Sequence, residues 1–281
     1  HTLGIADRNS VAGVVRAWAA LQEAPAGNGL RLATGARLVF ADGTPDIIVY
    51  PATRHGWGRL TRLLTRGNMR AAKGSCILFF TDLLDFLDDL LLIVLPYASG
   101  GDEEIHKNPP DYPHDGACPP RPIRDSTGPA LAKLLKSLEQ AAPGQVWLGV
   151  SMVYAGSDAR RLAGHRDIAA TAGVPLLATN DVLYAVGEDR PLHDVMTCIR
   201  HGTTIHKAGR LLGANAERHL KSPAEMARLF ATWPEAIAET IRLSERIRFD
   251  LGQLRYEYPR EPIPQGWSAD DWLAHLAWQG A

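Results

Sequence analysis

The sequence predicts an α/β protein with a mainly parallel sheet, and the number of strand–helix units favours a barrel. Short apolar segments alternate along most of the chain with longer segments of helical periodicity. At two places an apolar run stops at polar residues: residues 174–178 precede Thr179-Asn180-Asp181, and residues 2–6 precede Asp7. Buried parallel strands deliver polar side chains in this way to the C-terminal rim of a sheet, where barrel enzymes carry their chemistry.

The first half of the chain supplies four of the predicted strands. We expect strands at residues 2–6, 38–40, 47–50 and 90–95, the middle two joined by the hairpin signal Asp42-Gly43. Helices are expected at residues 11–22, capped by Asn9 or Ser10, and at residues 57–66, ended by Gly67. A short acidic helix is expected at residues 82–88.

The second half continues the alternation and then becomes helical. We expect a helix at residues 129–140, where leucines share one face, a strand at 146–150, a helix at 158–172 and a strand at 174–178. Ser222-Pro223-Ala224-Glu225 has the pattern of a capping box with proline at the first helical position, and Pro234 starts a helix that runs to about residue 246.

Composition changes divide the chain into three expected parts. Residues 1–215 form the barrel, interrupted at 98–126 by a proline-rich stretch that reads as a long surface loop. Residues 216–255 form a helical extension, and residues 256–281 form a linker and the start of a further domain. Because the chain begins with His1 and not with methionine, we expect it to be a piece of a longer protein whose preceding strand is absent.

The bulk composition is that of an ordinary soluble protein. The 281 residues carry a formal charge of −1, so net charge argues neither for nor against a nucleic-acid partner. Three separated cysteines, none in a CxxC pair, fit reduced thiols and a cytoplasmic location. No membrane span is expected. The most apolar stretch, residues 77–95, contains four aspartates, and each would cost about 3 kcal/mol near a bilayer centre.

Asp7 and Asp181 are the first candidates for chemistry. Two carboxylates on one rim could hold a divalent metal. Alternatively, Asp7 caps the helix that follows it and Asp181 binds local backbone N–H groups. A hydrolytic metal centre needs several histidine and carboxylate ligands together, yet no histidine lies beside either aspartate. The ten histidines form no HxH or HExxH pattern. The sequence therefore favours a capping role or the remnant of a site.

A basic stripe is the second candidate. The segment between residues 52 and 75 contains arginines and a lysine but no acid. Arg59, Arg62 and Arg66 fall at spacings of three and four, on one helix face, with Arg70 one turn further on. Such a stripe could follow a phosphate backbone, so these arginines are candidates for DNA contact, although a solvated helix face is the commoner outcome.

Several long segments, in order, resemble the N-terminal region of bacterial C-family DNA polymerases. The similarity is closest to the error-prone branch related to the DNA polymerase III alpha subunit. These segments are Ile5-Ala-Asp-Arg-Asn-Ser-Val-Ala-Gly-Val-Val15, Leu176-Leu-Ala-Thr-Asn-Asp-Val-Leu-Tyr184, Leu192-His-Asp-Val-Met-Thr-Cys-Ile-Arg200 and Asn215-Ala-Glu-Arg-His-Leu-Lys-Ser-Pro-Ala-Glu-Met226. The resemblance implies a PHP (polymerase and histidinol phosphatase) domain, a distorted (β/α)7 barrel that is here N-terminally truncated and followed by helices.

The resemblance also implies how the rim should have changed. Active PHP domains bind metal ions through histidine and carboxylate ligands and hydrolyse phosphoesters. Asp7 matches a family ligand, but Arg8 stands where a histidine is expected, and Arg37 stands where a glutamate is expected. Asp181 matches the last aspartate, with Leu183 in place of its histidine. We therefore expect a degenerate site without bound metal, of which Asp7 and Asp181 are the remaining weak candidates for ligands. Arg8 and Arg37 could pair with these aspartates.

The parent protein implied by the resemblance is an error-prone polymerase that acts in DNA repair and translesion synthesis. It would extend a DNA primer on a template with deoxynucleoside triphosphates and Mg²⁺, together with other translesion or replication proteins. Its catalytic carboxylates would lie in the palm, which the resemblance places from the end of residues 256–281 onward, so this chain alone is expected to be inactive. The alternatives are a metal-dependent phosphoesterase or 3′-5′ exonuclease of the PHP family, and a free-standing barrel enzyme of another chemistry.

Overall fold

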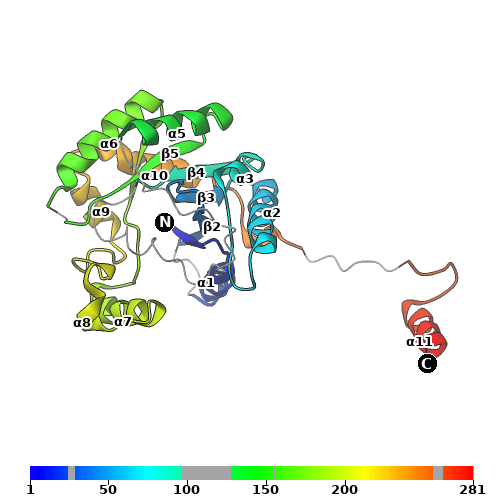
Figure 1. Cartoon of the computed structure of the whole chain (residues 1–281). Coiled ribbons are helices and arrows are strands. Elements are labelled where there is room, and N and C mark those ends of the chain that lie inside the picture. Colours follow the sequence, from blue (N-terminus) through cyan, green and yellow to red (C-terminus); the bar gives the residue numbers. More distant parts are fainter. Residues whose placement is uncertain (25–28, 97–127, 155, 256–261, 281) are drawn as a thin grey trace. The chain divides into compact units, whose positions relative to one another are not determined.

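The computed structural model describes residues 1–24, 29–96, 128–154, 156–255 and 262–280 (Figure 1). The chain divides into two compact units, residues 1–251 and residues 252–281. The proline-rich stretch at residues 98–126 and most of the linker predicted from residue 256 lie outside the described residues.

The first unit contains one curled sheet in which the strands follow their chain order (Figure 1). The six strands of the described residues are β1 (Thr2–Arg8), β2 (Arg31–Leu38), β3 (Ile47–Pro51), β4 (Leu90–Val94), β5 (Val146–Ser151) and β6 (Leu176–Thr179). Only β3 runs against its neighbours; the β1–β2, β4–β5 and β5–β6 pairs are parallel. The prediction of an α/β protein with a mainly parallel sheet is confirmed. In the described part of the chain β1 and β6 are the edges of an open sheet, and a closed PHP-type barrel stays a prediction.

The strand at residues 38–40 was predicted too late and too short. β2 starts at Arg31 and joins β3 in the expected antiparallel hairpin, with Leu38 opposite Ile47. Thr34, Gly35 and Arg37 interrupt the apolar pattern of β2, which hides the strand in the sequence. Gly35 is needed there, because a Cβ atom on it would lie 2.6 Å from Cδ1 of Tyr50 and 2.3 Å from the Val49 carbonyl oxygen.

The helices that cover the sheet are α1 (Ala12–Glu23), α2 (Arg54–Arg70), α3 (Phe80–Leu84), α5 (Gly128–Ala141) and α6 (Asp158–Ala172). α1, α5 and α6 begin and end within one residue of the predicted positions, whereas α2 is longer than predicted at both ends and α3 ends four residues earlier than predicted. At the start of α1, Ser10 Oγ accepts a hydrogen bond from the backbone N–H of Ala12 at 3.0 Å. Gly67 does not end α2, which continues to Arg70. It lies inside the helix, where glycine is needed because a Cβ atom would meet Cys76 Sγ at 2.6 Å and Leu78 Cδ2 at 2.7 Å.

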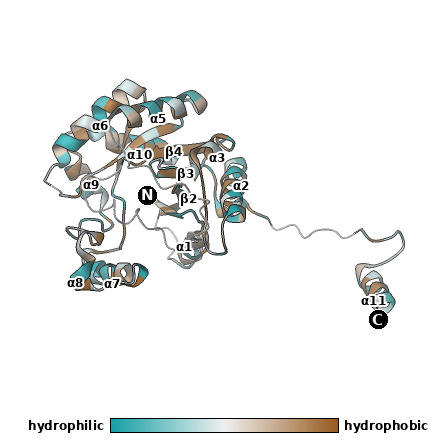
Figure 2. Ribbon diagram, viewed as in Figure 1, coloured by the Kyte–Doolittle hydropathy of each residue, from teal (hydrophilic) through white to brown (hydrophobic). Residues whose placement is uncertain are grey.

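Apolar side chains are buried on both faces of the sheet, as expected for strands that read as continuous apolar runs. One face packs against leucines of α2 and α5, including Leu60, Leu63 and Leu135. The other face buries Tyr50, Leu91, Ile93, Trp147 and Leu177 against Leu243 and Ile247. Figure 2 shows the apolar colour of β3 and β4 between helices that carry polar residues on their outer sides.

The helical part beyond β6 contains α7 (Arg190–Arg200), α8 (Ile205–Ala208), α9 (Pro223–Leu229) and α10 (Pro234–Arg246). Ser222 Oγ accepts from the Glu225 N–H at 3.1 Å, which confirms the predicted cap of α9, and Pro234 starts α10 as predicted. The second unit contains α11 (Ala269–Gly280). Among the helices described, none combines the length and apolar character that crossing a membrane would require.

Candidate functional site

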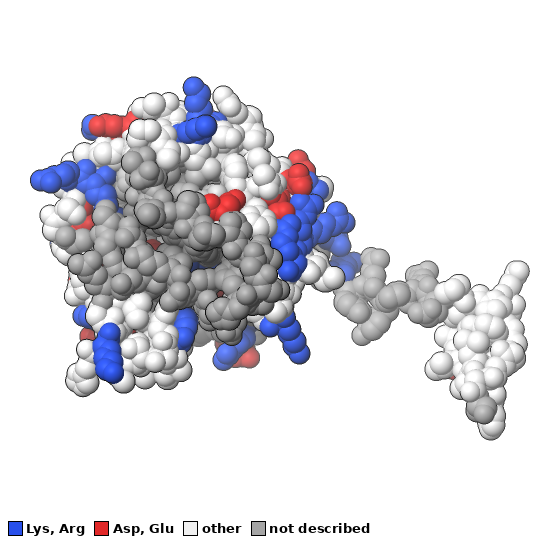
Figure 3. Space-filling model, viewed as in Figure 1, with Lys and Arg blue, Asp and Glu red and all other residues white. Residues whose placement is uncertain are grey.

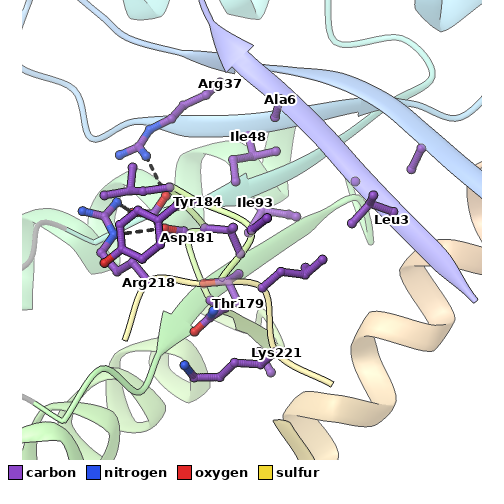
Figure 4. A pocket seen from close by; sticks show the side chains of 18 of the residues that line it. Leu3, Ala6, Arg37, Ile48, Ile93, Thr179, Asp181, Tyr184, Arg218 and Lys221 are labelled. Carbon is purple, nitrogen blue, oxygen red and sulfur yellow. Dashed lines mark hydrogen bonds and ion pairs between the residues drawn. The ribbon is translucent and has the colours of Figure 1, made fainter. Parts of the chain in front are cut away.

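A cavity of about 1330 Å³ opens beside β1 and the segment that follows β6 (Figure 4). It is lined by residues of β1, of the segment after β6, of α7, of the segment around Arg218 and of α10. All five positions that the sequence analysis assigned to a metal site line this cavity, namely Asp7, Arg8, Arg37, Asp181 and Leu183. The fold therefore brings the predicted rim residues together.

Asp181 is held by two arginines from different parts of the chain. Arg37 in β2 approaches one carboxylate oxygen with Nη1 at 2.8 Å, and Nη2 of Arg218 contacts the other oxygen (Figure 4). Arg218 Nε also donates to the Asp181 carbonyl oxygen at 3.0 Å. Asp181 has a φ of 44°, a left-handed conformation that aspartate tolerates better than most residues. Both carboxylate oxygens thus face guanidinium groups.

Arg37 reaches a second carboxylate, that of Asp46, with Nε at 2.8 Å. Asp46 is only 3% exposed, and Arg8 approaches the same oxygen at 3.5 Å. Parallel pairing of β1 and β2 aligns Arg8 with Arg37, which explains how two arginines come to share one aspartate. Charge-assisted bonds of this kind are about twice as strong as neutral ones, and they offset part of the cost of burying Asp46. Both arginines contact Oδ2, and among the described residues the buried Oδ1 atom has no hydrogen-bond partner.

Asp7 faces the start of α1 and not Arg8. Its Oδ2 atom accepts a hydrogen bond from the Gly13 N–H at 2.7 Å, in the first turn of the helix. A carboxylate at this position satisfies an otherwise unpaired N–H group and interacts favourably with the helix dipole. The capping interpretation of Asp7 agrees with this contact. The expected Arg8–Asp7 pair is replaced by an Arg8–Asp46 pair.

These contacts leave little room for a divalent metal. Within the described ranges, no three histidine, cysteine, aspartate or glutamate side chains lie close enough to hold one. The carboxylates of Asp181 and Asp7 are engaged by arginines and by a helix N-terminus, respectively. Arg8 and Arg37 add fixed positive charges, which oppose a cation electrostatically. The arrangement is suited to holding separate segments of the chain together by ion pairs.

Two histidines near the cavity, His193 and His219, make contacts with neighbouring residues. His193 on α7 lies 5.7 Å from the Tyr184 ring, measured between centroids, and burial lowers the pKa of His193. His219 Nδ1 lies 2.8 Å from the Ala216 carbonyl oxygen. His106 and His114 lie outside the described residues.

Sequence reasoning missed Asp46 and Arg218 as members of the cluster. Asp46 precedes β3 in the hairpin, and Arg218 follows α8 in an irregular segment. Neither carries a local pattern that separates it from a surface residue. The nearest signal was Arg37 itself, because an arginine inside a buried strand needs carboxylate partners.

The basic stripe on α2 is largely paired with acids. Arg70 makes a two-pronged contact with Asp82, at 2.6 and 2.9 Å, and Arg66 lies 2.6 Å from Asp85. Arg59 lies 2.9 Å from Asp88. The hydrogen bond from Arg70, more than any other cause, lowers the pKa of Asp82.

Stacking adds to these pairs. Both Arg59 and Arg66 stack over the Phe86 ring. This cation–π contact stabilises the two guanidinium groups in addition to their ion pairs. Figure 3 shows basic and acidic atoms side by side on the surface where α2 and α3 lie. Arg62 is exposed, and no ion pair is found for it within the described residues. DNA contact by the four arginines stays a prediction. Among these four, and with the described residues alone considered, Arg62 is the one without an acid that would compete with phosphate.

Proteins similar to this chain include several with the name error-prone DNA polymerase. The chain is 48% identical over 284 residues to a protein of Bradyrhizobium sp. (strain ORS 278) named error-prone DNA polymerase, covering 99% of this chain and 22% of that protein. Proteins of the same name from Rhodopseudomonas palustris (strain BisB5) and Caulobacter vibrioides are 47% and 44% identical over 280 and 279 residues. These alignments cover 100% and 99% of this chain, and 23% of each relative.

The chain is therefore homologous, over nearly its whole length, to a part of proteins named error-prone DNA polymerase. It spans about a quarter of the length of the curated relatives it matches. No family model matches it.

Proposed function

We propose that this chain is a non-catalytic module of an error-prone DNA polymerase, and that its PHP-like rim has become a structural ion-pair cluster. The observation that carries this proposal is the Arg37–Asp181 contact of 2.8 Å inside the cavity. A position at which the resemblance expects a metal ligand holds a guanidinium that neutralises another expected ligand. Similarity to proteins named error-prone DNA polymerase supplies the context.

The parent polypeptide would carry the polymerase activity elsewhere. It would bind a DNA primer-template and deoxynucleoside triphosphates and, through carboxylates outside this chain, Mg²⁺ for nucleotidyl transfer. Its place would be in DNA repair and translesion synthesis in the cytoplasm, together with other replication proteins. The role of this module would be to stabilise that polypeptide, and direct DNA contact would fall to the α2 stripe.

Primer extension by the full-length gene product tests the parent activity, on undamaged templates and on templates with an abasic site. Extension that requires Mg²⁺ and persists in the Arg37→Lys variant would support a structural rim. A full-length product that extends no primer under any of these conditions would overturn the proposed function.

The competing function is metal-dependent phosphoester hydrolysis by the module itself. The residues present do not fit it, because the two remaining aspartates are occupied and two arginines face the rim. Incubating this chain with Mn²⁺ and single-stranded DNA would reveal any 3′-5′ exonuclease. Release of nucleotides that is lost in an Asp181→Asn variant would establish the competing function instead.

A further inference from the structure

The helix α7 presents its apolar residues to solvent. Leu192, Val195, Met196 and Ile199 follow the spacing of one helix face and are 63%, 45%, 54% and 75% exposed. The buried residues of α7 are Thr197 and Cys198. The four exposed residues are named the α7 stripe. A surface helix ordinarily turns its apolar stripe toward the core, so the α7 stripe can be buried only by contact with a partner surface.

The α7 stripe belongs to a larger apolar surface. Leu192 and Met196 line the same cavity as the exposed residues Val182, Leu183 and Leu220. Val186 and Ile205, also exposed, lie just before α7 and at the start of α8. Single exposed apolar residues are common, but five of these residues line one cavity, and a grouping of this kind marks an interaction surface.

We propose that the α7 stripe is the contact surface for another part of the same polypeptide, one that lies outside this chain in the parent polymerase. This inference rests on the proposed function. The matched relatives have about four times the length of the chain, so most of such a protein has no counterpart here. Domains joined in one polypeptide are at high effective concentration, and a modest apolar surface is then enough to hold them together.

The partner surface should be apolar at its centre and acidic at one border. Arg200 at the end of α7 and Lys207 on α8 are exposed beside the stripe. A second copy of this chain fits less well, because it would bring the same cations together.

Methionine oxidation by hydrogen peroxide reports directly on this surface. Met196 lies in the α7 stripe, and Met69 on α2 is 83% exposed and serves as the internal reference. In this chain alone both should be oxidised readily. In the full-length product Met196 should be oxidised about tenfold more slowly relative to Met69, because burial blocks access to the sulfur. Equal relative rates in the two proteins would overturn the proposal.

Two variants of the full-length product sharpen the test. Ile199→Glu places a charge in the stripe and should return the Met196 oxidation rate to that of the isolated chain. Val15→Glu, at a 63% exposed position on α1, should leave it protected. Dimerisation of the isolated chain in sedimentation velocity, abolished by Ile199→Glu, together with an unprotected Met196 in the full-length product, would assign the stripe to a second copy. Because the readout is oxidation, loss of primer extension would count against the proposed function and not against this interface.

Discussion

Arg37 and Asp181 lie 144 residues apart in the chain and form an ion pair of 2.8 Å that joins β2 to the segment after β6. The same guanidinium binds Asp46 through Nε at 2.8 Å, so one arginine links three parts of the first unit. Arginine suits this role because its planar group can bind two carboxylates at once and stays charged when partly buried.

Replacing Arg37 with methionine should destabilise the protein by about 3 kcal/mol, because it leaves the buried Asp46 and the partly buried Asp181 short of a partner. The measurement is the free energy of unfolding in urea at neutral pH. The matched control is Arg62→Met on the exposed face of α2, which should change stability by less than about 0.5 kcal/mol. Equal effects of the two substitutions would mean that the cluster contributes no stability.

Two glycines of α2 give opposite predictions for the same substitution. Gly67→Ala should destabilise by about 1–3 kcal/mol, because its Cβ atom would clash with Cys76 and Leu78. Gly58→Ala should stabilise by about 0.5–1 kcal/mol, since nothing lies within 4 Å of its Cβ position and alanine is the better helix former. Thermal unfolding of both variants checks the sign. A stabilising Gly67→Ala would show that α2 is not packed as described.

The environment of His165 should make the stability of the protein depend on pH in the acidic range. Burial, aided by the charge of Arg161, lowers the pKa of His165 to about 4. The unfolded chain takes up a proton near the ordinary pKa of about 6.5. The contribution of neutral His165 is therefore fully present above about pH 6.5 and is lost as the pH falls toward 4. Unfolding midpoints across this range should fall less steeply for His165→Gln than for the natural sequence. Identical slopes would contradict the prediction.

The elements with strong local signals were predicted nearly residue by residue. α6 and α10 were predicted with accurate ends. Pro234 marks the start of α10, and α6 fills the segment between two predicted strands. β2 was largely missed. Its Thr34 is buried, its Gly35 packs beneath Tyr50, and its Arg37 lies between carboxylates, and only the folded sheet makes these three residues acceptable in a strand.

Some residues of the candidate site were predicted from the sequence and others were missed. Asp7, Arg37 and Asp181 were identified because two of them end strands and the third departs from a known pattern. Arg218 was not, because its partner Asp181 lies 37 residues away in the sequence. Asp46 was not either, although Arg37 is only nine residues away, because the pairing of β2 with β3 is what brings the two side chains together. Pairing preferences of single charged residues cannot be read without the topology that brings them together.

The α2 stripe yields a prediction that separates DNA contact from folding. Reversing the charge of Arg66 would place a carboxylate beside Asp82 and Asp85 and should lower stability, so a loss of DNA affinity would be ambiguous. Arg62→Glu avoids this. If the stripe follows a phosphate backbone, Arg62→Glu should reduce DNA affinity of the full-length product and lower the salt slope by about one, without changing the unfolding midpoint. Unchanged affinity and slope would remove Arg62 from the interface.

The claim that the rim is a structural ion-pair cluster is tested most directly by calorimetric titration of this chain with Mn²⁺ and Zn²⁺. The contacts of Asp7, Asp46 and Asp181 with a helix N-terminus and with arginines predict no stoichiometric binding at micromolar metal. Binding of one or more ions per chain at micromolar affinity, abolished by Asp181→Asn, would contradict the account.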